Sequence, residues 1–241
     1  MSPLRRAAAA PAAAGDVAVP AGVAVLHLFA RLRADFDATA FASALAGAEE
    51  NGIQALTFAV LGHKAQVGVM LLGPELWALR ATQAAVETTG LDLVGSYLSI
   101  TEISEYAEAL PEVAKRHRLH PVLPPDGARV LAFYPMSKRR GVDANWYALD
   151  FDERFRLMHD HGRHGRRHAG KVVQLVTAST GLDDWEWGVT LFATEPTALK
   201  DVVYELRYDE VSARYADFGP FIVGLLCAPP DLGPLCGADG S

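Results

Sequence analysis

Two stretches of the chain predict the same order of strands and helices, and this repeat constrains the fold more than any other feature. The first begins with residues 23–33, which alternate as in a strand, and residues 38–51, typical of a helix ending at Asn51-Gly52. A hairpin, a helix and a strand are then predicted at 53–61 with 65–72, at 74–89 and at 91–100. The order β-α-β-β-α-β is that of a ferredoxin-like unit.

The second stretch repeats this order after a connection rich in proline. Residues 101–127 include Pro111, Pro121, Pro124 and Pro125, so we expect them to join the two repeats. The predicted strands are 128–134, 171–178, 185–193 and 219–227, and the predicted helices are 150–168 and 196–208. We expect Tyr134 to end its strand, because Pro135 lacks the N–H that ladder pairing needs.

The repeat predicts an α+β fold in which two ferredoxin-like βαββαβ units pack or merge face to face. We expect a disordered tail at 1–20, an N-terminal ferredoxin-like domain at 21–110, a linker at 111–127, a C-terminal ferredoxin-like domain at 128–228 and a flexible tail at 229–241. A cleaved presequence is the alternative for residues 1–20, although their Ala/Pro composition lacks the Leu-rich core of a secretion signal.

The composition excludes several classes of function. The net charge of −7 argues against nucleic acid as the main partner. No apolar stretch reaches the ~18 residues of a membrane span, so we expect none. Cys227 and Cys236 form no CxxC pair, which fits a reducing cytosol and predicts a cytoplasmic protein.

The helix predicted at 150–168 carries a candidate metal ligand. His161 follows Met158 on an apolar stripe, and a neutral imidazole in an apolar pocket is suited to binding haem iron. A core histidine bonded to a backbone carbonyl is the alternative, and His164 and His168 share roughly the same face. A zinc site is less favoured, because no cysteine or carboxylate cluster completes a set of four ligands.

Two further residues can carry chemistry at the end of the strand predicted at 128–134. Tyr134 can lose an electron and a proton beside an oxidised iron, or it is a packed aromatic. Lys138 can hold a carboxylate as a point charge, or it is an ordinary exposed lysine. The surrounding cations indicate a local anion site or a solvated face: Lys138, Arg139, Arg140, Arg163, Arg166 and Arg167.

Five segments together resemble the chlorite dismutase superfamily, and most closely its coproheme decarboxylase branch. They are FYPMSKRR (133–140), LMHDHGRHGRR (157–167), AGKVVQL (169–175), GLDDWEWGVTLF (181–192) and YELRYDEVSARYADFG (204–219). The resemblance extends from about residue 21 to residue 227. It implies the family fold, a dimeric α+β barrel made of two ferredoxin-like domains.

The resemblance also implies roles for individual residues. His161, in the H-G-x-x-G-R motif, would be the proximal iron ligand, Tyr134 the catalytic radical tyrosine, and Lys138 a catalytic residue near a reacting propionate. The implied porphyrin-binding set is His120, Tyr134, Pro135, Met136, Ser137, Lys138, His161, Arg166, Gln174 and Ser212. His120 falls where many members carry a pocket arginine, so the implied distal base is His117, His120 or neither.

The implied reaction is the hydrogen-peroxide-dependent oxidative decarboxylation of Fe-coproporphyrin III (coproheme), both substrate and redox cofactor, to haem b. The implied partners are coproporphyrin ferrochelatase and further copies of the chain in a homopentamer. A haem peroxidase or chlorite dismutase of the same fold is one alternative, although the YPMSK signature argues against the second. A porphyrin-binding carrier without catalysis is the other.

Overall fold

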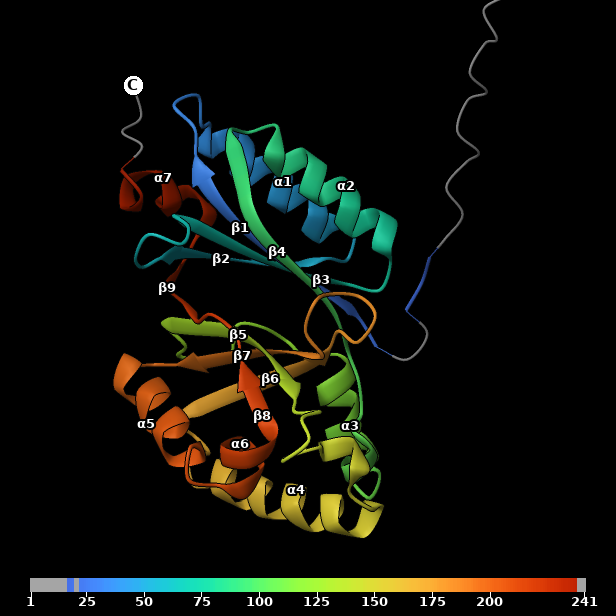
Figure 1. Ribbon diagram of the computed structural model, residues 1–241. Helices are drawn as coiled ribbons and strands as arrows, with labels where there is room; N and C mark the ends of the chain where they lie inside the picture. Colours follow the sequence, from blue (N-terminus) through green and yellow to red (C-terminus); the bar gives the residue numbers. More distant parts are fainter. Residues whose placement is uncertain (1–16, 20–21, 238–241) are drawn as a thin grey trace, which may run out of the picture.

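The strands of the described residues join into one antiparallel sheet that closes on itself (Figure 1). The structure is a computed structural model that describes residues 17–19 and 22–237. The strands are β1 (Ala24–Leu32), β2 (Gln54–Val60), β3 (Val67–Gly73), β4 (Leu91–Thr101), β5 (Val130–Lys138), β6 (Val172–Ala178), β7 (Trp187–Ala193), β8 (Ala216–Phe218) and β9 (Ile222–Cys227). Their order is β7-β6-β4-β1-β3-β2-β9-β5-β8, and β5 also pairs with β7, so eight strands form a ring.

Each half of the ring has the predicted ferredoxin-like order. The first half is β1-α1-β2-β3-α2-β4, with α1 (Ala38–Glu50) and α2 (Leu76–Glu87). The second is β5-α4-β6-β7-α5-β9, with α4 (Phe151–Arg166) and α5 (Pro196–Leu206). Figure 1 shows α1 and α2 on one side of the strands and α4 and α5 on the other. The α+β class predicted from the repeat is therefore confirmed.

Alternation along the strands divides the core into an interior and two outer layers. In β1, Leu26 and Leu28 pack toward α1 and α2, whereas Val25 and Phe29 point into the ring. In β5, Phe133 points into the ring and Tyr134 points outward to a cluster that includes side chains of α5. Successive side chains of a strand point to opposite faces, so each strand serves two layers.

The prediction that Tyr134 ends its strand is wrong, because β5 continues to Lys138. The partner on this side of β5 changes at the proline: β9 pairs with 130–133 and β8 with 136–138. The missing N–H of Pro135 falls in the gap between these two partners, while its carbonyl accepts a hydrogen bond from the N–H of Gly219 at 2.8 Å. Proline is tolerated where no ladder donor is needed.

The segments predicted as linker and C-terminal tail contain helical structure. The 101–127 connection holds η1 (Glu105–Ala107) and α3 (Glu112–Leu119). The stretch from residue 229 forms η3 (Pro229–Asp231) and α7 (Leu232–Leu235), with Leu232 fully buried against the α1 layer. Residues 238–241, and all of the predicted 1–20 tail except 17–19, lie outside the described residues.

The helix predicted at 196–208 ends early, and a separate helix follows it. α5 ends at Leu206, and α6 (Glu210–Tyr215) begins after Asp209. The Asp209 side chain caps α6 by accepting hydrogen bonds from the N–H groups of Val211 and Ser212. None of the helices in 17–19 and 22–237 has the length and apolarity that crossing a bilayer requires.

Candidate functional site

The outward face of the second half of the sheet carries several of the predicted site residues. Tyr134 of β5 pairs with Val189 of β7, and Val189 pairs with Val176 of β6. Gln174 stands two residues before Val176, so it lies on the same face as Tyr134. Met136 and Lys138 continue this face along β5. Four predicted residues from two strands therefore share one surface.

Tyr134 is held among aromatic side chains on this face. Its ring is stacked on Phe221 with the centroids 4.3 Å apart, and the ring of Phe218 meets it edge-on with the centroids 5.9 Å apart. Only 5% of Tyr134 is exposed, and burial raises its pKa to about 12. The phenol is therefore protonated at neutral pH and can give up a proton only together with an electron or to a strong base.

Lys138 is buried at the end of the same face. Its Nζ atom lies 4.3 Å from the ring centroid of Trp146, an arrangement that allows a cation–π interaction. Burial lowers the pKa of Lys138 to about 8, although the carboxylates of Asp209 and Glu186 oppose this shift. Glu186 also accepts a hydrogen bond from the backbone N–H of Lys138 at 2.8 Å. The alternative of an ordinary exposed lysine is wrong, because only 8% of the residue is exposed.

His161 of α4 is paired with the carboxylate that caps α6. Its Nδ1 atom lies 2.9 Å from Oδ2 of Asp209, and no hydrogen bond in the described part of the chain engages its Nε2 atom. A carboxylate at one ring nitrogen orients the imidazole and makes the other nitrogen a better metal ligand. Burial tends to raise the pKa of Asp209, but the hydrogen bonds from His161 and Ser212 outweigh it and lower this pKa to about 2.

The other histidines of this helix face make a structural contact. His164 and His168 both bond to Glu205 of α5, at 3.3 and 2.8 Å, and Arg167 bonds to the same carboxylate at 2.8 Å. The hydrogen bond from Arg167, followed by that from His168, lowers the pKa of Glu205 to about 2. These contacts join α4 to α5 and distinguish both histidines from His161. Within the described ranges, no group of three or more His, Cys, Asp or Glu residues has the geometry of a metal site.

The remaining predicted site residues differ in their burial and in their hydrogen bonds. Ser212 donates its N–H to Asp209, and Ser137 accepts a hydrogen bond from the N–H of Glu186. Pro135 is buried in β5, and Arg166 is exposed at the end of α4. His117 and His120 are exposed on α3 and at its end, and no hydrogen bond or ion pair among the described residues joins either one to Tyr134 or His161. Figure 1 places α3 and α5 on opposite flanks of the lower half.

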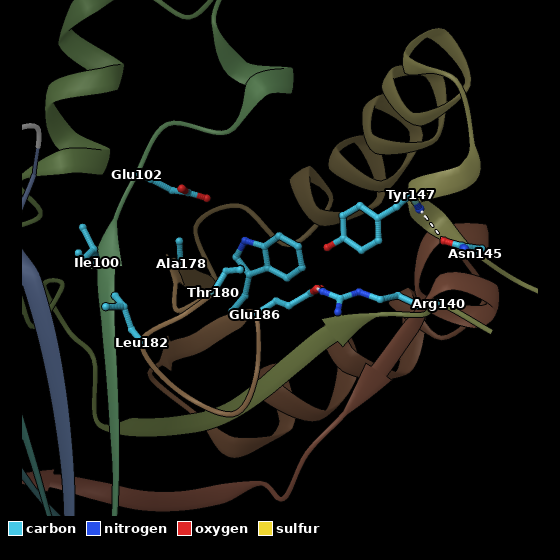
Figure 2. A pocket seen from close by; sticks show the side chains of 10 residues that line it. Ile100, Glu102, Arg140, Asn145, Tyr147, Ala178, Thr180, Leu182 and Glu186 are labelled. Atoms are coloured by element: carbon cyan, nitrogen blue, oxygen red, sulfur yellow. Dashed lines mark hydrogen bonds and ion pairs between the residues drawn. The ribbon is translucent and has the colours of Figure 1, made fainter.

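A cleft of about 730 Å³ opens between side chains that include Ala178, Tyr147 and Glu102 (Figure 2). Trp187 pairs with Met136 on one side and with Ala178 on the other, so the floor of the cleft belongs to the same outward face as Tyr134. The full lining is Ile100, Glu102, Arg140, Asn145, Tyr147, Ala178, Thr180, Leu182, Glu186 and Trp187. A pocket of this size with an apolar floor and a few polar groups is typical of small-molecule sites.

Sequence reasoning missed the two carboxylates that organise these residues. Asp209 directly precedes the Glu-Val-Ser segment, and an aspartate at that point is an N-cap signal that could have revealed α6. Glu186 stands between two tryptophans and gave no such signal. Its buried side chain binds Arg140 and the backbone of Lys138, contacts that only the folded chain shows.

Comparisons with known proteins identify relatives of this chain. The profile of the family described as chlorite dismutase matches residues 33–227. A coproheme decarboxylase of Staphylococcus carnosus is 44% identical over 188 residues, which are 73% of this chain and 74% of that protein. A protein of Natronomonas pharaonis, named as a candidate heme-binding protein, is 42% identical over 206 residues, 79% of this chain. The chain spans only 34% of that relative's length.

Solved structures show the same fold. A heme-binding protein from Thermus thermophilus superposes with a TM-score of 0.80 at 36% identity, over 90% of this chain and 95% of that one. A chlorite dismutase from Candidatus Nitrospira defluvii, in a mutant form, superposes with a TM-score of 0.70 at 19% identity, over 90% and 97% of the two chains. At that lower identity the likeness concerns the fold alone.

Proposed function

The chain belongs to the chlorite dismutase family, and we propose that it is a coproheme decarboxylase, an oxidoreductase that converts Fe-coproporphyrin III to haem b with hydrogen peroxide. The observation that carries this proposal is the carboxylate of Asp209. It bonds to Nδ1 of His161, leaving Nε2 available, and its charge also acts on Lys138. One carboxylate thus orients the imidazole and favours the charged form of a buried lysine, and a metalloporphyrin with carboxylate arms requires both an iron ligand and a cation.

The residues present fit this substrate. Apolar side chains remain exposed on the sheet and on α4, with Val176 42% and Phe155 45% exposed, and such surface is suited to a flat macrocycle. Lys138 and Arg166 supply positive charge for the propionates, and Gln174 and Ser212 supply hydrogen-bonding groups. Met136, Pro135 and Ser137 complete the wall contributed by β5. His117 or His120 would serve as distal base only if α3 brings it toward the porphyrin.

In this proposal Nε2 of His161 would hold the iron, and the iron porphyrin oxidised by peroxide would supply the oxidising power. Tyr134 would give one electron to the oxidised porphyrin and release its proton, and the resulting phenoxyl radical would take a hydrogen atom from the propionate carbon next to the ring. Transfer of a second electron to the oxidised porphyrin and loss of CO2 would leave a vinyl group. One propionate, one peroxide and one proton give one vinyl group, one CO2 and two waters, and two such rounds give haem b.

The proposal includes further properties of the chain. Coproporphyrin ferrochelatase, which makes the substrate, would be a partner, and the chain would assemble as a homopentamer. Residues 21–110 and 128–228 would be its two ferredoxin-like domains, with porphyrin bound by the second.

The test is a stepwise addition of hydrogen peroxide to the coproheme complex, with the porphyrin products identified by mass spectrometry. We expect two successive losses, each equal in mass to formic acid. The Tyr134→Phe variant should bind coproheme nearly as well and form no vinyl group, whereas Tyr204→Phe, at an exposed tyrosine of α5, should react normally. Oxygen release from chlorite, or tight binding without peroxide-driven turnover, would contradict the proposal.

A further inference from the structure

Glu102 is an acid of the cleft without a counter-charge. It follows the last residue of β4 and lines the cleft together with Trp187 and Ala178 (Figure 2). Among the described residues, no ion pair joins Glu102 to a lysine, arginine or histidine. Arg140 is the one cation among the lining residues, and it is engaged by Glu186. An anion that enters the cleft therefore meets an uncompensated carboxyl group.

The other titratable groups at the cleft supply no positive charge to Glu102. The Glu186 carboxylate is held by Arg140 and by the backbone N–H of Lys138. Burial, followed by the hydrogen bond with Glu186, raises the pKa of Tyr147 to about 12, so this phenol is neutral. Asp183, on the β6–β7 loop, turns its carboxylate to the backbone N–H of Leu98. Glu102 is left as the carboxyl group of the cleft lining that no cation of the lining holds.

The cleft is within reach of a molecule bound at Tyr134. The row Met136–Trp187–Ala178 is adjacent to the row Tyr134–Val189–Val176, and neighbouring rows on one face of a sheet are about 7 Å apart. A substrate that covers both Tyr134 and Trp187 extends toward Glu102, which lines the same cleft as Trp187, so one of its carboxylate arms can reach this residue. Where two carboxylates share a site, ionisation of both is unfavourable and the pair can hold one proton between them.

We propose that Glu102 holds a proton that it shares with one carboxylate arm of the porphyrin substrate, so that substrate binding takes up a proton at this residue. The inference rests on the proposed function, because it needs a substrate with carboxylate arms. The local environment supports it: Glu102 is an exposed residue, but the walls of the cleft remove part of its hydration and so raise its pKa, and the indole N–H of Trp187 acts in the opposite direction. Glu102 is thus a positioning residue that makes substrate affinity depend on pH.

The test measures proton uptake when ferric coproheme binds, without peroxide. Calorimetric titration in two buffers of different ionisation enthalpy, near pH 7, gives the number of protons taken up. We expect Glu102→Gln to take up about one proton fewer than the unmodified chain. Its affinity should also fall less steeply as the pH rises, because the amide N–H donates to the arm at every pH. Glu108→Gln is the matched control, since Glu108 is exposed on the same segment outside the cleft lining.

The two proposals fail in different ways. Equal proton uptake by Glu102→Gln and the unmodified chain, both binding coproheme, would overturn the role of Glu102 and leave the decarboxylase proposal standing. Absence of coproheme binding in the unmodified chain would overturn the decarboxylase proposal itself. Because every titratable group other than Glu102 is common to the two proteins, the difference between them reports on Glu102 alone.

Discussion

Nδ1 of His161 lies 2.9 Å from Oδ2 of Asp209, and the same carboxylate begins helix α6. The two residues are 48 positions apart, so this hydrogen bond joins α4 to the turn between α5 and α6. A substitution at Asp209 therefore affects both the orientation of the His161 imidazole and the N-cap of α6. Substitution by asparagine separates these two effects, because asparagine caps a helix about as well as aspartate but carries no charge.

We predict that Asp209→Asn folds normally and binds coproheme about 10- to 100-fold more weakly, the usual effect of losing the carboxylate partner of a metal-binding histidine. Absorbance titration with coproheme measures the affinity. Asp201→Asn, at an exposed position of α5, is the control and should bind as the unmodified chain does. Unchanged affinity in Asp209→Asn would mean that His161 does not bind the iron through an imidazole set by this contact.

The lowered pKa of Lys138 leads us to predict that the protein loses affinity for coproheme in alkaline solution. Its pKa of about 8 means that the cation is present below this pH and is lost as the pH rises through it. Between about pH 7 and pH 9.5 the loss of this charge should lower the affinity by about tenfold beyond any change due to Glu102, because most of the positive charge disappears while the substrate carboxylates stay ionised. Lys138→Arg keeps its charge throughout this range and should show only the change due to Glu102. A parallel fall in both proteins would remove Lys138 from the binding site.

Because His27 is buried inside the ring, we predict that the folded protein becomes less stable in acid. It is fully buried, its Nε2 atom bonds to Thr190 at 3.1 Å, and its Nδ1 atom has no partner in the described structure. Burial lowers its pKa from 6.5 to about 3, so the unfolded chain binds the proton first. The free energy of unfolding should therefore be highest above pH 6.5 and decrease by about 1.4 kcal/mol per pH unit toward pH 3.

Urea unfolding at about pH 6.5 and pH 4.5 measures this effect, and the expected fall from His27 is about 2 kcal/mol. His27→Gln should show a smaller fall, because glutamine has no proton to bind in this range. His63→Gln, at an exposed histidine, should behave as the unmodified chain. Equal falls for His27→Gln and the unmodified chain would show that other groups cause the acid sensitivity.

Leu232 predicts that the C-terminal segment stabilises the first half of the sheet. Its side chain is fully buried in the layer beneath α1, whereas Leu235, one turn further along α7, is 57% exposed. Leu232→Ala should lower the free energy of unfolding by about 2–4 kcal/mol, the cost of a large-to-small change in a core. Leu235→Ala should change it by less than about 0.5 kcal/mol. Similar small effects at both positions would mean that α7 contributes no packing.

The sequence predicted the elements that local periodicity defines. Both βαββαβ halves are present, and their strands and helices begin and end within a few residues of the predicted bounds. Strand β5 extends past Pro135 because its pairing partner changes there from β9 to β8. This change of partner depends on tertiary structure and cannot be predicted from the local sequence pattern. The Gly, Pro and Leu composition of α7 suggested a flexible tail. The helix is stabilised instead by the burial of Leu232 against residues distant in the sequence, which local composition does not reveal.

The candidate site was only partly accessible to sequence reasoning. Helical spacing could not distinguish His161 from His164 and His168, because all three fall roughly on one face of the helix predicted at 150–168. The difference lies in their partners, since Asp209 belongs to α6 and Glu205 to α5. The resemblance to a known family singled out His161, and the hydrogen bond to Asp209 now offers a physical reason for that choice.

Strand β5 presents Phe133 to the interior of the ring and Tyr134 to the opposite surface. Inserting or deleting one residue between Val130 and Lys138 would exchange the two, turning the phenol inward and a benzyl group outward. Length changes in this strand are therefore compatible with the proposed chemistry only in steps of two. The loop after Lys138 has no alternation of inward and outward side chains. An insertion or deletion of any number of residues there would change the rim of the cleft without reversing the side chains of β5.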